Sequence, residues 1–273
     1  MESIIDLSGR TALVTGGSRG IGAGIGRSLA LAGAHVILVG RGGDGLRASR
    51  AQIAADGGRA DVLEWDIGNG DSAPDLMAAA GVDGRLDILV HAAGNQIRKP
   101  ALEFSAADWD AIHDLHLRAA FLLAQAFTRR LVGDGQPADD PRGEDRRSSG
   151  PTGDDQRGSI VFVGSLTSTR LGLPGIVGYA AAKSGLLGLT RTLAAEWATH
   201  GVRVNAVLPG FVSTELTRDV DDDPDRRAIT MRAPQRRLGS PADVGSAAAF
   251  LASPAAGFIT GESLTVDGGW SGA

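Results

Sequence analysis

The stretch TALVTGGSRGIG, residues 11–22, places a short apolar run directly before a glycine-rich turn. The run 12–14 predicts a buried strand, and the spacing of apolar residues over 21–32 predicts an amphipathic helix. A strand, a glycine-rich turn and a helix in this order are typical of the first unit of a nucleotide-binding α/β fold. The alternative is an ordinary tight turn between two packed elements.

The glycines give this turn its chemistry. Gly16, Gly20 and Gly22 permit a tight bend, a close approach of the backbone to a pyrophosphate, and close packing of helix on strand. The helix N-terminus adds free N–H groups and a partial positive charge. The predicted phosphate-binding residues are Gly16, Ser18, Arg19, Gly20, Ile21 and Gly22.

The same alternation of strand and helix continues along the chain. Further apolar runs lie at 36–39, 62–63, 86–90, 160–163, 202–207 and 264–266, and helical patterns lie at 46–55, 106–131, 180–199 and 241–252. Apolar runs without polar alternation indicate strands covered on both faces. We therefore predict one α/β domain over residues 1–273: a Rossmann-type, doubly wound, seven-stranded parallel sheet with helices on both faces.

Residues 133–158 interrupt the pattern. They contain no large apolar side chain and are rich in Gly, Pro, Asp, Arg and Ser. Such a stretch buries too little surface to offset its ordering entropy. We predict a flexible surface insertion there, and nothing in its sequence supports a binding role.

Composition excludes several classes of protein. The 273 residues include no Cys, which excludes disulfides, thiolate metal sites and cysteine nucleophiles. The net charge of −5 argues against a nucleic-acid surface. No apolar run approaches the ~18 residues of a membrane span. The acidic start, Met1-Glu2-Ser3-Ile4-Ile5-Asp6, is unlike a signal peptide. These features predict a cytoplasmic protein without nucleic-acid or membrane partners.

The end of the second predicted strand indicates which dinucleotide is bound. NAD sites usually place an acid there, to hold the ribose 2′-hydroxyl. Here the residue is Arg41, and Arg41 or Arg19 could pair with a 2′-phosphate. We therefore favour NADP over NAD. The alternative is that both are solvated surface arginines.

The lone tyrosine of the chain, Tyr179, stands four residues before Lys183, one of its two lysines. On a helix the two side chains share a face. A free phenol with a pKa of about 10 is a poor base at pH 7, and a nearby ammonium would lower that pKa. Tyr179 is thus a candidate general acid/base tuned by Lys183. Ser165 follows a predicted strand and could hold a substrate oxygen, and Ser168 is its rival.

Together these residues resemble the short-chain dehydrogenase/reductase family. Asp66 and Ile67 match the position that contacts the adenine, and 91–94, with Ala93 and Gly94, matches a structural loop at the cofactor. Residues 209–214 match the segment that meets the nicotinamide. The residues so implied there are Pro209, Gly210, Val212 and Thr214.

The resemblance implies roles for the site residues. Tyr179 would exchange a proton with the substrate oxygen while hydride moves to or from the nicotinamide. Ser165 would hydrogen-bond that oxygen, and Lys183 would hold the nicotinamide ribose. It further implies a homotetramer in which helices 106–131 and 180–199 pair between subunits. Residues 211–238 resemble the flap over the substrate.

Two departures from the family pattern stand out. His116 occupies the position of an Asn that helps to hold a water in the proton relay. It could hold that water, carry the proton itself, or impair the site. His91 and Ala92 replace an Asn pair, which we expect to loosen that hydrogen-bonded element while sparing Ala93 and Gly94. His113 and His116 lie three residues apart, but no other ligand motif accompanies them, so no metal is predicted.

The substrate is expected to be a small carbonyl compound or alcohol. Residues 94–103 resemble sugar-acid members of the family, the gluconate 5-dehydrogenases and 2-deoxygluconate 3-dehydrogenases. Arg98 or Lys99 could neutralise a substrate carboxylate. The alternative is a solvated loop at the rim of the cleft.

The leading function is an NADP-dependent oxidoreductase acting on a secondary alcohol or ketone, with a sugar acid as a candidate substrate. One alternative is a 3-oxoacyl thioester reductase. The acidic run at 219–225 argues mildly against it, because a carrier protein docks on a basic patch. The other is a cofactor-binding sensor or scaffold with impaired chemistry.

Overall fold

In the computed structural model, residues 4–68, 72–80, 86–133, 157–214 and 232–272 are described. Within these ranges seven strands form one sheet, in the order β3-β2-β1-β4-β5-β6-β7, and every neighbouring pair is parallel. The strands are β1 (Thr11–Thr15), β2 (His35–Gly40), β3 (Arg59–Glu64), β4 (Ile88–His91), β5 (Gly158–Val163), β6 (Val202–Pro209) and β7 (Ser263–Val266). The predicted Rossmann-type sheet is confirmed.

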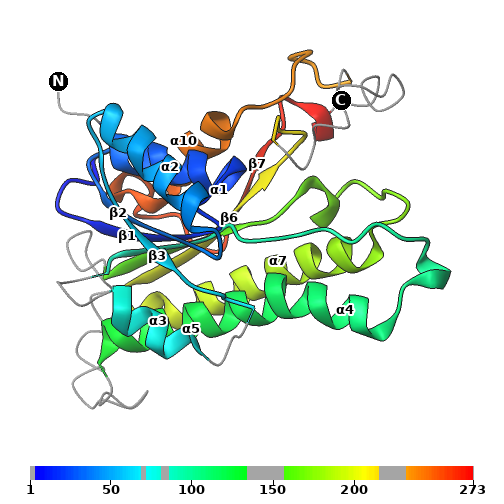
Figure 1. Cartoon of the computed structure of the whole chain (residues 1–273), viewed down its shortest axis with the longest axis horizontal. Coiled ribbons are helices and arrows are strands. Elements are labelled where there is room, and N and C mark those ends of the chain that lie inside the picture. Colours follow the sequence, from blue (N-terminus) through cyan, green and yellow to red (C-terminus); the bar gives the residue numbers. More distant parts are fainter. Residues whose placement is uncertain (1–3, 69–71, 81–85, 134–156, 215–231, 273) are drawn as a thin grey trace.

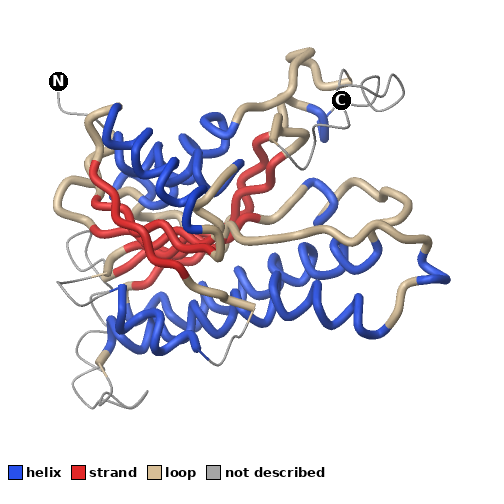
Figure 2. Tube along the Cα trace, viewed as in Figure 1, coloured by secondary structure: helices blue, strands red, loops and turns tan. Residues whose placement is uncertain are grey.

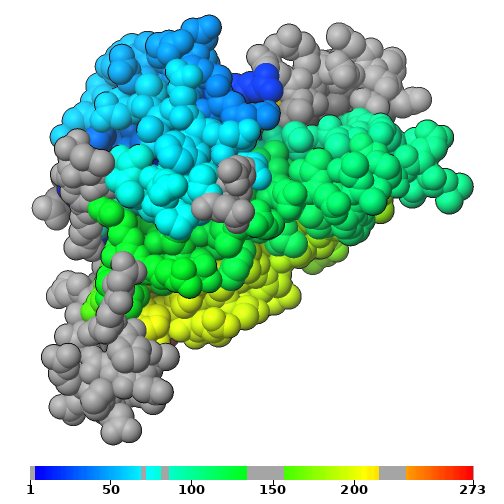
Figure 3. Space-filling model, turned by 60° about the horizontal axis from the view of Figure 1, so that its bottom comes forward, coloured from blue at the N-terminus to red at the C-terminus, as the bar shows by residue number. Residues whose placement is uncertain are grey.

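Helices cover both faces of the sheet (Figure 1). One layer contains α1 (Gly20–Leu31), α2 (Gly43–Ala55) and α10 (Pro241–Ala252). The other contains α3 (Ala73–Ala80), α5 (Ala119–Val132) and α7 (Val177–Trp197), with α4 (Ala106–His113) leading into α5. Figure 3 shows this second layer from outside, with the bands of α3, α5 and α7 side by side.

The side chains of the strands pack into two separate hydrophobic cores, one on each face of the sheet. Leu13, Leu89 and Phe162 point into the core beneath α3, α5 and α7. Val14, Val90 and Val161, each the neighbour of one of these residues in its strand, point into the core beneath α1 and α10. Successive side chains of a strand alternate between faces, so strands buried on both faces read as uninterrupted apolar runs.

The structure differs from the predicted elements in three places. The helix predicted at 106–131 is interrupted by a π-helical turn at Asp114–Arg118, which sequence periodicity does not mark. The helix α3 was not predicted. The strand β5 begins at Gly158, the last residue of the stretch assigned to the insertion, where the backbone pairs with Val202 of β6.

Much of the predicted insertion and flap lies outside the described residues, at 134–156 and 215–231. The two ends of the flap are described, and they meet. Val212 forms a parallel bridge with Gly239, and Ser213 donates its backbone N–H to the Gly239 carbonyl. Within the described ranges no helix is long and apolar enough to cross a membrane.

The strand order reverses between β1 and β4, since the chain runs from β1 outward to β3 and then returns to the other side of β1. Loops that leave the carboxyl ends of strands on either side of this point diverge and leave a crevice. Figure 2 shows the strands in red, with loops in tan leaving the sheet toward the same region. The predicted site residues lie mostly on these loops.

Candidate active site

The turn between β1 and α1 has the form expected of a phosphate cradle. Gly16 has a φ of +70°, and a Cβ there would lie 2.8 Å from the Cα of Ala93. A Cβ at Gly22 would overlap the carbonyl oxygen of Gly16. The N-cap residue of α1, Arg19, makes no side-chain cap, and the first residues of the helix, Gly20, Ile21 and Gly22, line the pocket described next.

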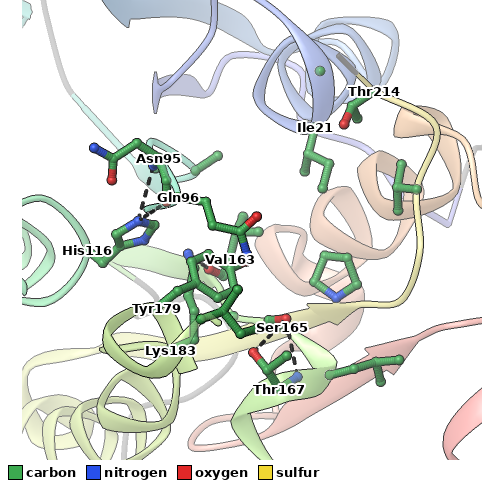
Figure 4. Close-up of a pocket in the computed structure, with 18 of the residues that line it drawn as sticks. Ile21, Asn95, Gln96, His116, Val163, Ser165, Thr167, Tyr179, Lys183 and Thr214 are labelled. Atoms are coloured by element: carbon green, nitrogen blue, oxygen red, sulfur yellow. Dashed lines mark hydrogen bonds between the residues drawn. The ribbon is translucent and has the colours of Figure 1, made fainter. Parts of the chain in front are cut away.

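A single pocket joins this turn to the candidate catalytic residues (Figure 4). Most of the predicted site residues line it: Gly16, Arg19, Gly20, Ile21, Gly22, Gly94, His116, Ser165, Tyr179, Lys183, Pro209, Gly210, Val212 and Thr214. They lie in α1, α7 and the π turn, at the end of β6, and on the loops that follow β1, β4, β5 and β6, so the pocket is built by tertiary structure.

Five predicted residues do not line the pocket. Ser18 lies in the turn but its carbonyl accepts a hydrogen bond from Ser49. Arg41 is exposed just beyond β2, and Asp66 is exposed just beyond β3, beside the buried Ile67. Ala93 donates its N–H to Thr15 behind Gly16. All five lie near the carboxyl edge of the sheet that carries the pocket.

Ser165 and Ser168 lie at opposite ends of one short 3-10 turn, Leu166–Ser168. Ser165 is the N-cap residue before it, and Ser168 is its last residue. Ser165 faces the pocket, and its Oγ accepts hydrogen bonds from the N–H and the hydroxyl of Thr167, at 3.2 and 3.0 Å. Ser168 accepts from the Ser165 N–H and donates to the Lys183 carbonyl at 2.9 Å. Ser165 is therefore the serine that faces the pocket, and Ser168 fixes the turn to α7.

The electrostatics of Tyr179 differ from the prediction. Burial raises the pKa of its phenol, and a hydrogen bond with Ser165 opposes this only in part. The ammonium of Lys183 lies 5.7 Å from the centre of the Tyr179 ring and donates to the Val163 carbonyl at 2.6 Å. Burial also lowers the pKa of Lys183 to about 7. Lys183 therefore carries less charge at neutral pH than the sequence argument assumed, and burial decides the Tyr179 pKa.

His116 lies in the π turn with its ring edge-on to Tyr179, the ring centres being 5.3 Å apart. Its Nε2 is 2.8 Å from the carbonyl oxygen and 3.1 Å from the N–H of Asn95, and the ring packs on the Cα of Gly94. Burial, followed by the charge of Lys183, lowers the pKa of His116 to about 2. His116 is therefore neutral at physiological pH and holds the Gly94–Asn95 backbone.

The expected loosening at His91 does not occur. His91 is fully buried, and its Nδ1 lies 3.2 Å from the hydroxyl oxygen of Thr15. That hydroxyl oxygen also accepts the N–H groups of Ala92 and Ala93. With two donors already on its oxygen, Thr15 is placed to donate to His91. The histidine thus forms part of a bonded link between β1 and β4.

Two adjacent cationic side chains near the edge of the pocket, Arg98 and Lys99, have different partners. Lys99 donates to the carboxylate of Asp108 at 2.6 Å, and Asp108 belongs to the capping box that begins α4. Arg98 is exposed, lines the pocket, and donates from Nε to the side chain of Gln96 at 3.0 Å. Of the two cations proposed for a substrate carboxylate, Arg98 lies at the pocket.

The pocket also contains residues that the sequence analysis did not single out. Thr167 is one, and others are Asn95, Gln96, Val163, Leu166, Leu171, Leu173, Ile176 and Phe211. Several lie between Ser165 and Tyr179 along the chain. Their position between two candidate catalytic residues was the available signal. Within the described ranges, no cluster of three metal-ligating side chains is present.

The pocket fits a nicotinamide dinucleotide. The glycine positions leave a cradle that a Cβ would fill, and the N-terminal residues of α1, which has no side-chain cap from Arg19, line the same pocket. From there the pocket runs past Gly94 and Pro209 to Ser165, Tyr179 and Lys183. A phosphate cradle at one end and a phenol with a buried lysine at the other are the parts that hydride transfer coupled to proton transfer requires.

Comparison with known proteins gives the class. The family described as short chain dehydrogenase matches residues 10–143, and the one described as enoyl-(acyl carrier protein) reductase matches residues 148–271. The chain is thus an oxidoreductase that belongs to the short-chain dehydrogenase family.

Individual relatives are similar over nearly their whole length. Gluconate 5-dehydrogenase of Gluconobacter oxydans is 37% identical over 268 residues, which cover 97% of this chain and 96% of the relative. A 3-oxoacyl-[acyl-carrier-protein] reductase of Vibrio cholerae is 36% identical over 268 residues, with coverage of 97% and 98%. The crystal structure of a gluconate 5-dehydrogenase of Burkholderia cenocepacia, in complex with NADP and tartrate, is 33% identical with a TM-score of 0.83 and coverage of 98% of both chains.

Proposed function

We propose that this protein is an NADP-dependent dehydrogenase/reductase that interconverts a secondary alcohol and a ketone on a sugar acid. The observation that carries the proposal is the shared pocket, in which Tyr179, Ser165 and Lys183 face the same space as the glycine-rich turn. The similarity to gluconate 5-dehydrogenases supports a sugar acid as the substrate.

The side chains divide the chemistry between them. A bound NADP supplies the hydride donor or acceptor at its nicotinamide ring and, when oxidised, a positive charge. Tyr179 gives a proton to the carbonyl oxygen in reduction and removes it in oxidation. Ser165 donates a hydrogen bond to that oxygen. Lys183 holds the ribose, and its protonated form favours the phenolate of Tyr179, against the effect of burial.

A sugar acid also needs a group that binds its carboxylate. Arg98 lies at the pocket and presents a planar guanidinium, which matches a carboxylate with two parallel hydrogen bonds. Its Nε is held by Gln96, which leaves the two terminal nitrogens for the ligand. We assign the carboxylate to Arg98.

The test is NADPH oxidation against a panel of keto sugar acids, neutral ketones and a 3-oxoacyl thioester, with Tyr179→Phe as the control. We expect turnover of a keto sugar acid and a loss of about a thousandfold in Tyr179→Phe, the usual order for removing a general acid. Near-full activity of Tyr179→Phe would refute the mechanism. Turnover of the thioester alone would favour the second candidate, which the Vibrio cholerae relative supports.

A cofactor-binding protein with impaired chemistry is the candidate from another class. In that case the wild type binds NADPH tightly, with a Kd measured by fluorescence, and yet oxidises it with no member of the panel. Intact Ser165, Tyr179 and Lys183 in one pocket argue against this candidate.

The preference for NADP rests on two arginines. Arg41 directly follows β2, and Arg19 lies in the glycine-rich turn before α1. We expect Arg41→Ala to weaken NADPH binding about tenfold or more, because it removes a charge-assisted bond to the 2′-phosphate. NADH binding should change little. Equal losses for the two cofactors would contradict the preference.

We further infer that the protein acts in the cytoplasm, which rests on its composition, and that it forms a homotetramer, which rests on the family resemblance. The layer of α5 and α7 is the face expected to pair. The mass in solution, measured by light scattering, tests this.

A further inference from the structure

The hydrogen bonds around Ser165 indicate a role for a neighbouring threonine. We propose that Thr167 is a positioning residue that makes Ser165 a hydrogen-bond donor toward the reacting oxygen. The inference rests on the proposed function, because the oxygen in question belongs to the substrate of that reaction.

The hydroxyl group of Ser165 can form only a limited number of hydrogen bonds. A serine hydroxyl has one proton to donate and two lone pairs that accept. Thr167 occupies both lone pairs of Ser165, with its backbone N–H at 3.2 Å and its hydroxyl at 3.0 Å (Figure 4). The remaining capacity of Ser165 is its own proton, which then points away from Thr167 and into the pocket.

The turn that carries both residues is fixed in place. Ser165 caps the 3-10 turn Leu166–Ser168, and Ser168 ties that turn to the Lys183 carbonyl on α7. Tyr179 lies on the same helix, one turn before Lys183. The distance from Ser165 to the phenol is therefore set by packing, and only the direction of the Ser165 proton is left for Thr167 to decide.

That direction has a chemical consequence. A donated hydrogen bond stabilises the negative charge that develops on a carbonyl oxygen, or on the Tyr179 phenolate, and an accepted one does not. A serine free to rotate would spend part of its time accepting a hydrogen bond from Tyr179, which stabilises the neutral phenol. Thr167 removes that state before the substrate arrives.

The experiment compares Thr167→Val with Thr167→Ser. Valine keeps the shape and the backbone N–H but loses the hydroxyl, whereas serine keeps the hydroxyl. Thr169→Val, on the exposed side of the same turn, is the matched control. We expect Thr167→Val to lower kcat about tenfold with the KM for NADPH unchanged, the order expected for one hydrogen bond. Thr167→Ser and Thr169→Val should stay within about twofold of the wild type.

The pH profile separates this role from simple loss of structure. For alcohol oxidation, kcat/KM rises with pH as the base is deprotonated. We expect this rising limb to move to higher pH in Thr167→Val and to stay in place in Thr167→Ser. A lower rate with an unmoved limb would show a merely structural effect and overturn the proposal.

The lone tyrosine gives a second readout that needs no turnover. Tyrosinate absorbance in this protein comes from Tyr179 alone. Its titration midpoint should be higher in Thr167→Val than in Thr167→Ser. Equal midpoints and equal kcat values would overturn the positioning role, and the proposed function would still stand if the wild type is active and Tyr179→Phe is not. A wild type that turns over nothing on the panel would overturn both.

Discussion

Arg98 and Lys99 are adjacent in sequence, but the fold gives them different positions. Lys99 is held by Asp108 at 2.6 Å, at the start of α4, whereas Arg98 lines the pocket. We therefore expect Arg98→Gln to raise the KM for a keto sugar acid by ten- to a hundredfold, roughly the range for one charge-assisted hydrogen bond. The KM for a neutral ketone should not change.

Lys99→Gln is the matched control for Arg98→Gln. It should lower the free energy of unfolding by less than about 1 kcal/mol, since the ion pair is partly exposed, and leave KM unchanged. Steady-state kinetics on the two substrates, together with urea unfolding, measure both effects. An equal rise in KM for acidic and neutral substrates in Arg98→Gln would remove the assignment of the carboxylate.

At the scale of residues, the sequence indicated which side chains lie together in the pocket, but it did not indicate how their surroundings change their pKa values. The rarity of Tyr and Lys located Tyr179 and Lys183, and both line the pocket. The shift in the Tyr179 pKa was predicted with the wrong sign for this structure. Burial is set by residues far apart in the chain, so a spacing of four residues contains no information about it. Thr167 was overlooked for the same reason.

At the scale of elements, the β1–α1 turn depends on the absence of side chains. A Cβ at Gly22 would overlap the Gly16 carbonyl oxygen, and relief would move either α1 or the cradle. We expect Gly22→Ala to lower the free energy of unfolding by about 2 kcal/mol or more, since it overpacks the turn. NADPH binding should weaken along with stability, because we propose that the same backbone holds the phosphates.

Gly42→Ser is the control for Gly22→Ala. A Cβ at Gly42 meets nothing within 4 Å, and Ser is favoured at the N-cap position that Gly42 holds on α2. Its free energy of unfolding should lie within about 0.5 kcal/mol of the wild type. Urea unfolding and fluorescence titration with NADPH measure the two variants. If Gly22→Ala binds NADPH normally, the cradle does not depend on that close contact.

Elements were predictable where their burial is uniform, and less so elsewhere. β5 and β6 are buried at every residue, and their sequences are mostly apolar, although β6 also buries Arg203 and Asn205. β3 lies at the sheet edge with a mixed pattern of exposure, and only its run 62–63 was visible. The π turn at Asp114–Arg118 keeps the helical spacing of apolar residues almost intact. Periodicity therefore could not show that His116 is turned toward the pocket.

At the scale of the whole molecule, the order of strands follows from a few general rules. Parallel strands joined by helices require crossovers of one hand, and a doubly wound sheet then has one switch point. The site residues gather at the carboxyl edge beside that point, although they lie far apart in sequence. The fold class was therefore predictable from alternation alone, whereas the chemistry inside the pocket required packing.

The tight packing of the sheet and its loops also makes the fold sensitive to acid through two buried histidines. Burial, and next the charge of Lys183, lowers the pKa of His91 to about 3 and that of His116 to about 2. In the unfolded chain each imidazole has a pKa of about 6.5. Above that pH both states hold a neutral ring, and stability is complete. As the pH falls below about 6.5, only the unfolded chain takes up protons, and the folded state loses stability.

The expected loss follows from proton linkage and is specific to these residues. Each buried histidine should lower the free energy of unfolding by about 1.36 kcal/mol for each pH unit below about 6.5. At pH 5 this amounts to about 2 kcal/mol for each. The carboxylates with lowered pKa, such as Asp108, affect stability only as the pH nears about 4, where an unfolded aspartate titrates.

Urea unfolding at pH 7 and pH 5, at one protein concentration, should therefore show a fall of about 4 kcal/mol in the free energy of unfolding of the wild type. His91→Asn and His116→Asn should each show about half that fall, and His200→Asn, a partly exposed control, the full fall. An equal fall in all four proteins would mean that the buried imidazoles do not set the acid sensitivity of this fold.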